Sequence, residues 1–177
     1  MVTTSAILLG ISLLVGLVWV VNQSGDSSLA QLQSDVEIDV ETFASRGRDH
    51  IQPGSQTPDY QTFPSTSGPH YPHPENYGFY EEPLPMATLV HNLEHGDIVI
   101  YYKPSVSDEV KEHLKYLSQF TKEGSGVLFV PSKDIEGEVV ATAWTKKMSL
   151  STFKEEKLGA FIYEFIYEGP EKLAPKQ

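Results

Sequence analysis

Histidine is the residue type through which this chain could do chemistry. The sequence contains six histidines and no cysteine. The lack of cysteine excludes a thiol nucleophile, a dithiol redox pair, a disulfide scaffold and every cysteine-based zinc or iron–sulfur site. Among the remaining side chains, imidazole is the commonest ligand of transition metals. We expect His113, on a charged helical segment, to face solvent. The other five histidines lie close together along the chain, at His50, His70, His73, His91 and His95.

Two of these histidines, His91 and His95, stand four residues apart in the motif HNLEH. On a helix, this spacing puts both imidazoles on one face, where they can reach the same ion. The apolar residues of the segment fall on the other side of the expected helix. The two histidines therefore face water unless another part of the chain covers them.

A proline-rich and aromatic segment, residues 53–85, is the expected cover. It contains most of the twelve prolines of the chain, which excludes a helix interior and a central strand. Its tyrosines and phenylalanines are untypical of a disordered linker, so we expect an ordered, functional loop. The loop carries two histidines in the sequence GPHYPHP. We predict a metal site made of His91, His95 and His70, which either His73 or His50 completes.

Three or four imidazoles suit copper or zinc, whereas Mg²⁺ and Ca²⁺ need an oxygen-rich set of ligands. Copper is the expected ion and zinc is the alternative. A thioether from Met86 or Met148 would favour Cu(I), although core packing is the expected role of both residues. We expect the side chains of Tyr71 and Tyr80 to be packing residues as well.

The motif HNLEH also matches the pattern of the inverzincin metalloproteases, in which two histidines bind zinc and the glutamate is the general base. Glu94 would take that role in a zinc-dependent hydrolase, with a distant third ligand such as Glu155, Glu156 or Glu164. Against this alternative, Gly96 ends the helix at once, and the domain is small for a substrate cleft.

The N-terminal region reads as a membrane anchor. Residues 6–21 are apolar apart from two glycines and one serine, and the first charged residue is Asp26. With the residues before it, this run is long enough for a hydrocarbon core of about 30 Å. A basic start and a nearby cleavage site are both missing, so we predict an uncleaved single-pass helix in residues 1–24 rather than a signal peptide. The acidic residues that follow favour an extracytoplasmic domain at the cell membrane.

The net charge of −11 is unevenly spread. Residues 25–45 are acidic and contain no base, which is typical of a solvated spacer. Residues 46–170 are the expected soluble domain, and residues 171–177 are a tail. The negative charge argues against nucleic acid as a partner, since nucleic-acid binding depends on lysine and arginine.

The pattern of the domain predicts an α+β fold with the element order α-β-α-β-β-α and a small mixed sheet. We expect helices over 86–95, after an N-cap at Ser107, and after a capping box of Thr152 and Glu155. The expected strands are residues 97–103, 127–130 and 139–150, together with an edge strand at 36–40. The first two main strands should be parallel, and a turn at Glu136–Gly137 should pair the second and third as a hairpin.

A family resemblance rests on six stretches of the sequence, namely residues 47–51, 66–72, 78–80 with Glu82–Pro83, 90–96, Lys103–Pro104 and 141–144. Through them, residues 50–170 resemble an uncharacterised family of small prokaryotic proteins that are mostly exported or tethered by one N-terminal helix. The family has no established activity, so the resemblance supports only the tether and the domain boundary. His50, His70, His91 and His95 lie inside its motifs, whereas His73 and Met148 do not.

These observations predict a membrane-anchored, extracytoplasmic copper-binding protein that sequesters or delivers metal, or that serves as an accessory subunit of a membrane complex. The zinc-dependent hydrolase is one alternative. A metal-free structural subunit, held to other membrane-protein subunits by its helix and aromatic loop, is another.

Overall fold

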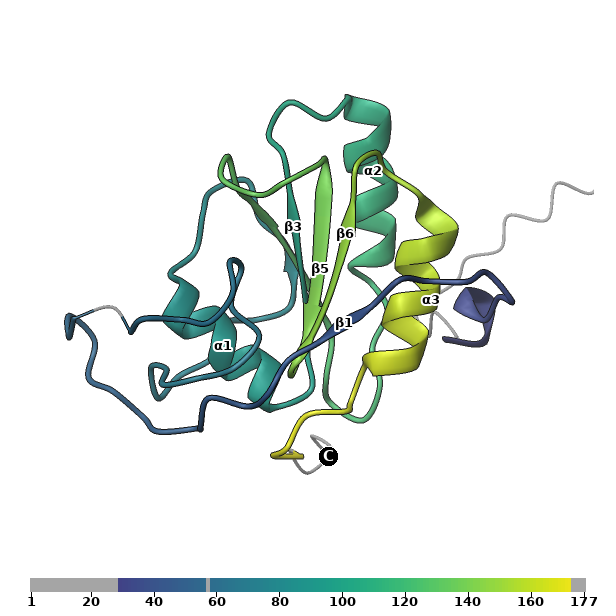
Figure 1. The fold of residues 1–177 in the computed structure, drawn as a ribbon. Coiled ribbons are helices and arrows are strands. Elements are labelled where there is room, and N and C mark those ends of the chain that lie inside the picture. The colour runs from purple at the N-terminus through teal and green to yellow at the C-terminus, as the bar shows by residue number, and fades with distance from the viewer. Residues whose placement is uncertain (1–28, 57, 173–177) are drawn as a thin grey trace, which may run out of the picture.

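In the computed structural model, which describes residues 29–56 and 58–172, a mixed sheet has helices on both faces (Figure 1). This confirms the α+β class. Helix α1 (Met86–Glu94) covers one face, and α2 (Asp108–Leu117) and α3 (Glu155–Phe165) cover the other. None of the helices in the described ranges is long and apolar enough to span a bilayer. The predicted anchor, residues 1–24, lies outside these ranges.

The described residues form a six-stranded sheet with the order β1-β6-β5-β3-β4-β2. The neighbouring strands β3 and β4 are parallel, as the β-α-β pattern predicts, and Ile100 lies opposite Phe129. The two outermost strands have only two residues each, and β2 is contributed by the proline-rich segment. The strands are β1 (Glu41–Thr42), β2 (Gly78–Phe79), β3 (Ile98–Tyr102), β4 (Val127–Pro131), β5 (Val139–Ala143) and β6 (Lys146–Leu150).

Three of the strand predictions are wrong. The strand expected over 139–150 is a hairpin of β5 and β6, because Thr145 adopts a left-handed φ of +63° and its N–H donates to the Thr66 carbonyl. Strand β5 pairs antiparallel with β3 rather than with β4. Strand β3 is buried along its whole length and so requires a partner on each side. The expected edge strand at 36–40 is also absent, and residues 41–42 pair with β6 instead.

Alternation along β3 divides the core into two layers. Ile98, Ile100 and Tyr102 face α2 and α3, whereas Val99 and Tyr101 face α1. The Ser107 hydroxyl caps α2 by accepting from the Val110 N–H, as predicted. The predicted capping box of α3 is wrong, since the N-cap is Lys154 without a side-chain bond. A short 3₁₀ helix, η1 (Leu29–Leu32), packs on α3.

Helix α1 ends where the chain that follows α3 crosses it. Gly96 has a φ of +84°, the left-handed conformation expected of a residue that ends a helix. The Gly96 carbonyl accepts from the Tyr167 N–H, and the Glu94 carbonyl accepts from the Glu171 N–H. A Cβ on Gly96 would lie 2.8 Å from the Tyr167 Cα. This close crossing fixes the last turn of α1, which carries the histidines.

We predict that Gly96→Ala lowers the free energy of unfolding by about 2–4 kcal/mol, because left-handed strain adds to a backbone clash. Gly124→Ala is the matched control. Gly124 has a similar φ of +94° but open space around it, so its cost should be about 1 kcal/mol. Urea unfolding of both variants measures the difference. Equal losses would contradict the structural role of the crossing.

Candidate metal centre

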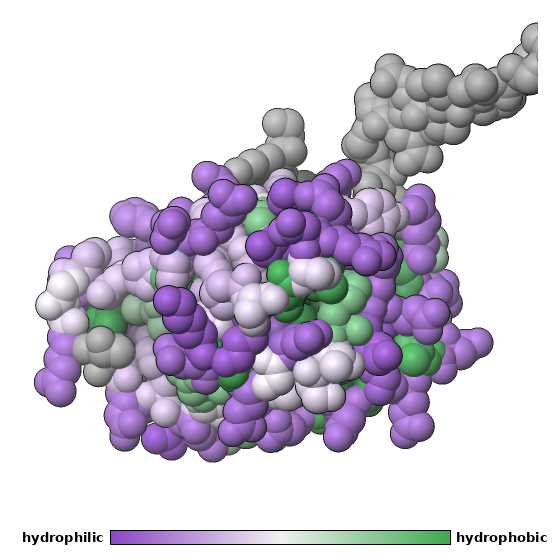
Figure 2. Space-filling view, turned by 90° about the horizontal axis from the view of Figure 1, so that it is seen from above, coloured by the Kyte–Doolittle hydropathy of each residue, from purple (hydrophilic) through white to green (hydrophobic). Residues whose placement is uncertain are grey.

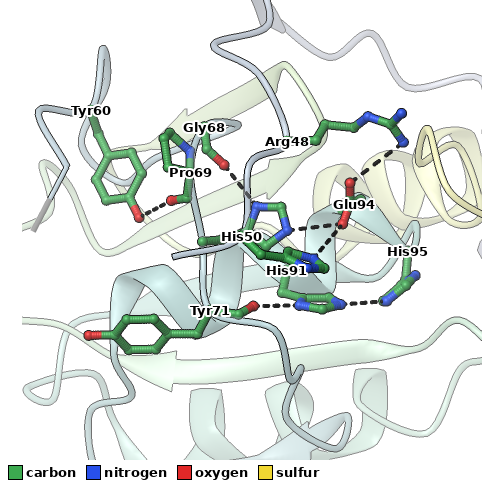
Figure 3. Close-up of polar contacts among 10 residues, drawn as sticks. Arg48, His50, Tyr60, Gly68, Pro69, Tyr71, His91, Glu94 and His95 are labelled. Atoms are coloured by element: carbon green, nitrogen blue, oxygen red, sulfur yellow. Dashed lines mark hydrogen bonds and ion pairs between the residues drawn. The ribbon is translucent and has the colours of Figure 1, made fainter. Parts of the chain in front are cut away.

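The candidate site lies between α1 and the proline-rich segment, on the side of α1 away from the sheet (Figure 3). The apolar side of α1, with Leu89 and Leu93, packs on the sheet. His91 and Glu94 lie on the same helix, His95 is its C-cap residue, and all three are buried. Polar side chains on a surface helix are normally exposed. Burial of these three therefore requires another segment over them, and the proline-rich loop is that segment. The predicted covering role of the loop is confirmed.

Asn92 is the main polar attachment between α1 and the loop. Its amide nitrogen donates to the Glu75 carbonyl at 2.8 Å, and its amide oxygen accepts from the Glu75 N–H at 3.0 Å. The same nitrogen donates to the Asp97 carboxylate at 2.7 Å. A second attachment joins the Tyr71 N–H to the Ala87 carbonyl. The loop is therefore docked by hydrogen bonds as well as by aromatic packing.

His70 and His50 are held together by a parallel β-bridge. The His70 N–H donates to the Asp49 carbonyl at 3.0 Å, and the Ile51 N–H donates to the His70 carbonyl at 2.8 Å. The His70 side chain is completely buried, whereas that of His50 is 51% exposed. The bridge thus delivers one buried and one solvent-facing imidazole to the same place.

Three imidazoles, those of His50, His70 and His91, converge on one point. They offer ligand atoms that all lie within 4.8 Å of one another. The His50 and His91 rings are stacked at 5.2 Å, and the His70 ring meets each of them edge-on, at 5.0 Å and 4.9 Å. These three residues could hold a metal ion. They come from three separate segments, which only the fold brings together.

The hydrogen bonds of the Nδ1 atoms prepare two of these rings for a ligand role. His70 Nδ1 lies 2.8 Å from the Gly68 carbonyl oxygen, and His91 Nδ1 lies 2.5 Å from the Tyr71 carbonyl oxygen. A carbonyl only accepts, so both Nδ1 atoms carry the proton. In the neutral rings, Nε2 is then left with a lone pair. Metal-binding histidines are typically oriented by this kind of bond.

His95 is placed beside the three histidines rather than among them. Its Nε2 atom lies 2.7 Å from His91 Nε2 and, since the latter has the lone pair, His95 is the donor. The His95 Nδ1 atom is buried and has no hydrogen-bond partner among the described residues. Unpaired buried polar atoms are costly, so His95 is an unsatisfied neighbour of the site.

The remaining candidates lie elsewhere. His73 is exposed and outside the three-histidine group. His113 forms an ion pair with Glu155 on the opposite side of the sheet and is partly exposed. The Met86 sulfur accepts from the Ser65 N–H and from the Tyr101 hydroxyl. Met148 is buried in the layer of α2 and α3. The two methionines are therefore engaged in packing, as expected.

Nitrogen atoms of two imidazoles and one guanidinium surround Glu94. Its Oε2 atom lies 3.0 Å from His70 Nε2 and 3.9 Å from His50 Nε2, and its Oε1 atom lies 3.6 Å from an Arg48 nitrogen (Figure 3). The carboxylate is only 2% exposed. Sequence reasoning considered it as a general base. The structure places it against the imidazoles.

Burial is the main influence on the pKa of His91, which it lowers from the ordinary value. The hydrogen bond to the Tyr71 carbonyl acts in the opposite direction, and the neighbouring His95 and His70 lower the pKa further. Glu94 partly offsets them. A neutral imidazole is the form that binds metal, so His91 is in the form that a ligand needs.

Sequence reasoning missed three contributors to the site. Arg48 and Asn92 lie inside the motifs that carry the family resemblance but were assigned no role. The Tyr71 carbonyl, rather than its side chain, orients His91. The side-chain hydroxyl of Tyr71 instead accepts from the Gly54 N–H. Backbone groups leave no mark in a sequence, so only the motif membership of Arg48 and Asn92 could have pointed to them.

Comparison with known protein families gives a match over most of the domain. The family model DUF3105, described as a protein of unknown function, matches residues 50–177. The matched range begins at His50 and includes every histidine of the candidate site. No curated protein and no solved structure matches the chain.

We predict that the metal-free protein loses stability as the pH falls below about 6.5, the ordinary pKa of histidine. Because the pKa of His91 is lowered in the folded state, the unfolded chain takes up that proton first. The stability is complete above pH 6.5 and is lost as the pH falls through the lowered value. His91→Asn, which keeps an N–H donor but does not titrate, should show a shallower decline. Urea unfolding at stepped pH with a chelator present measures both, and identical slopes would contradict the prediction.

Proposed function

We propose that this chain, which belongs to the DUF3105 family, binds a transition-metal ion through His50, His70 and His91. The observation that carries the proposal is the convergence of three imidazoles, two of them with Nδ1 tied to a carbonyl. Three histidine ligands leave coordination positions open. Those positions suit the uptake and release of an ion.

The proposed ion is copper, with zinc as the alternative. Imidazole nitrogens bind both ions well, and the described site contains no thiolate. His95 is a further candidate ligand because its Nε2 atom adjoins that of His91. An incoming ion would take the place of the hydrogen bond between the two rings. Exposed His73 has no part in this proposal.

We further propose that the chain is anchored at the cell membrane by residues 1–24, with the domain on the extracytoplasmic side. The support is the sequence of residues 6–21, which is apolar and uncharged. A tethered domain with an ion in an open coordination set would sequester metal or deliver it to another membrane-protein subunit.

Metal loading tests the binding proposal. The purified full-length protein, kept in detergent and exposed to Cu²⁺ or Zn²⁺, should retain about one ion per chain after desalting, as measured by elemental analysis. His70→Asn and His91→Asn keep an amide donor near the Nδ1 position but lose the Nε2 ligand. Their affinity should fall at least about tenfold. The function would be ruled out if the wild type retained no ion. It would also be ruled out if a variant that carries both His70→Asn and His91→Asn retained as much ion as the wild type.

The chain offers a matched control for that experiment. His113→Asn removes a histidine outside the site and should retain metal like the wild type.

A chelator should also lower the melting temperature of the loaded protein, because an ion at a hundred times its Kd stabilises the folded state by about 2.7 kcal/mol.

Membrane fractionation tests the anchor. The full-length chain should sediment with membranes and resist extraction at high salt, whereas a variant lacking residues 2–24 should be released. External protease should reach the domain in intact spheroplasts. A full-length chain recovered in the soluble fraction would contradict the anchor.

A further inference from the structure

The buried carboxylate of Glu94 lies directly against the three-histidine group. His70 Nδ1 is bound to the Gly68 carbonyl at 2.8 Å, so Nε2 is the ring nitrogen that faces the carboxylate. Nε2 and Glu94 Oε2 are hydrogen-bonded at 3.0 Å, and both side chains are buried. A cation bound between the two atoms would take the place of the proton that they share.

The surroundings of Glu94 leave one of its oxygens for that cation. Arg48 approaches Oε1, whereas Oε2 faces His70 and His50 at 3.0 Å and 3.9 Å. In a tetrahedral site with bonds of 2.0–2.2 Å, ligand atoms are about 3.3 Å apart. The distances from Glu94 Oε2 to the two imidazole nitrogens, 3.0 Å and 3.9 Å, lie on either side of that value. Small shifts of the side chains would therefore bring the carboxylate oxygen and both nitrogens into contact with one ion.

Among the described residues, no sulfur atom is a ligand candidate at the site. The Met86 sulfur is engaged by Ser65 and Tyr101, and Met148 packs on the other face of the sheet. Thioether and thiolate ligands select Cu(I), whereas carboxylate oxygens favour harder cations. A buried carboxylate also supplies negative charge that a divalent ion offsets better than a monovalent one.

From these observations we infer that Glu94 is an oxygen ligand of the ion, beside the three histidines, and that the site is selective for a divalent ion, Cu²⁺ or Zn²⁺, over Cu⁺. The inference rests on the proposed metal-binding function and specifies its ion. It also gives Glu94 a role in binding rather than in proton transfer.

Glu94→Gln is the decisive variant. A glutamine side chain can still form a hydrogen bond with His70 Nε2 and accept from Arg48, so the metal-free variant should fold, as thermal unfolding measures. Its affinity for Zn²⁺ and Cu²⁺, measured by chelator competition on the full-length protein, should fall at least about tenfold. The Cu²⁺/Cu⁺ reduction potential of the copper-loaded protein should rise, since loss of the carboxylate destabilises Cu²⁺ more than Cu⁺. Glu156→Gln, an exposed site on α3, is the control for the change in charge.

X-ray absorption of the zinc-loaded wild type gives an independent measurement that does not depend on how the variant folds. The expected first shell has three imidazoles and one further light ligand, without sulfur. A sulfur ligand, four imidazoles, or unchanged Zn²⁺ affinity in Glu94→Gln would overturn the inference while leaving metal binding intact. A wild type that retains no ion would instead remove the proposed function itself.

Discussion

Docking of the proline-rich segment on α1 is the interaction on which the site depends. Asn92 binds the backbone of Glu75 in both directions, and the Tyr71 carbonyl accepts from His91. These bonds satisfy polar groups that would otherwise be buried without partners, which would be costly. They also hold a long irregular loop in one conformation. Without the loop, His91 and His95 would be exposed histidines on a short helix, and His70 would not reach them.

The sheet and its crossing segments supply the rigidity behind that docking. The buried side of α1 rests on β3 and β4, and the chain after α3 binds its last turn at Gly96. A metal site needs ligands held close to the geometry that the ion requires, so a fixed helix end and a docked loop serve the same purpose. His50 differs from the others because it is half exposed. It gives the cluster a side that faces solvent, where an ion would enter or leave in the proposed function.

Sequence patterns predicted the local elements better than their partners. Residue periodicity, the Ser107 cap and Gly96 located α1, α2 and β3, and the parallel pairing of β3 with β4 followed from the intervening helix. The pairing of β5 was predicted wrongly, because a run of apolar residues does not say which neighbour buries it. The turn at Thr145 was missed because a left-handed threonine is uncommon.

The sequence by itself determined the chemistry of the candidate site. The tertiary structure decided which residues form it. The absence of cysteine and the grouping of histidines mean that any transition-metal site is built mainly from imidazole, with residues 53–85 as the cover. Folding then selected His50, His70 and His91, left His73 in solvent, and turned Glu94 toward the imidazoles. The physical reason is that ligation depends on distances between atoms. Those distances arise from a β-bridge between residues 50 and 70 and from the docking of the loop. Neither contact produces a repeating pattern of residues that could be recognised in the sequence.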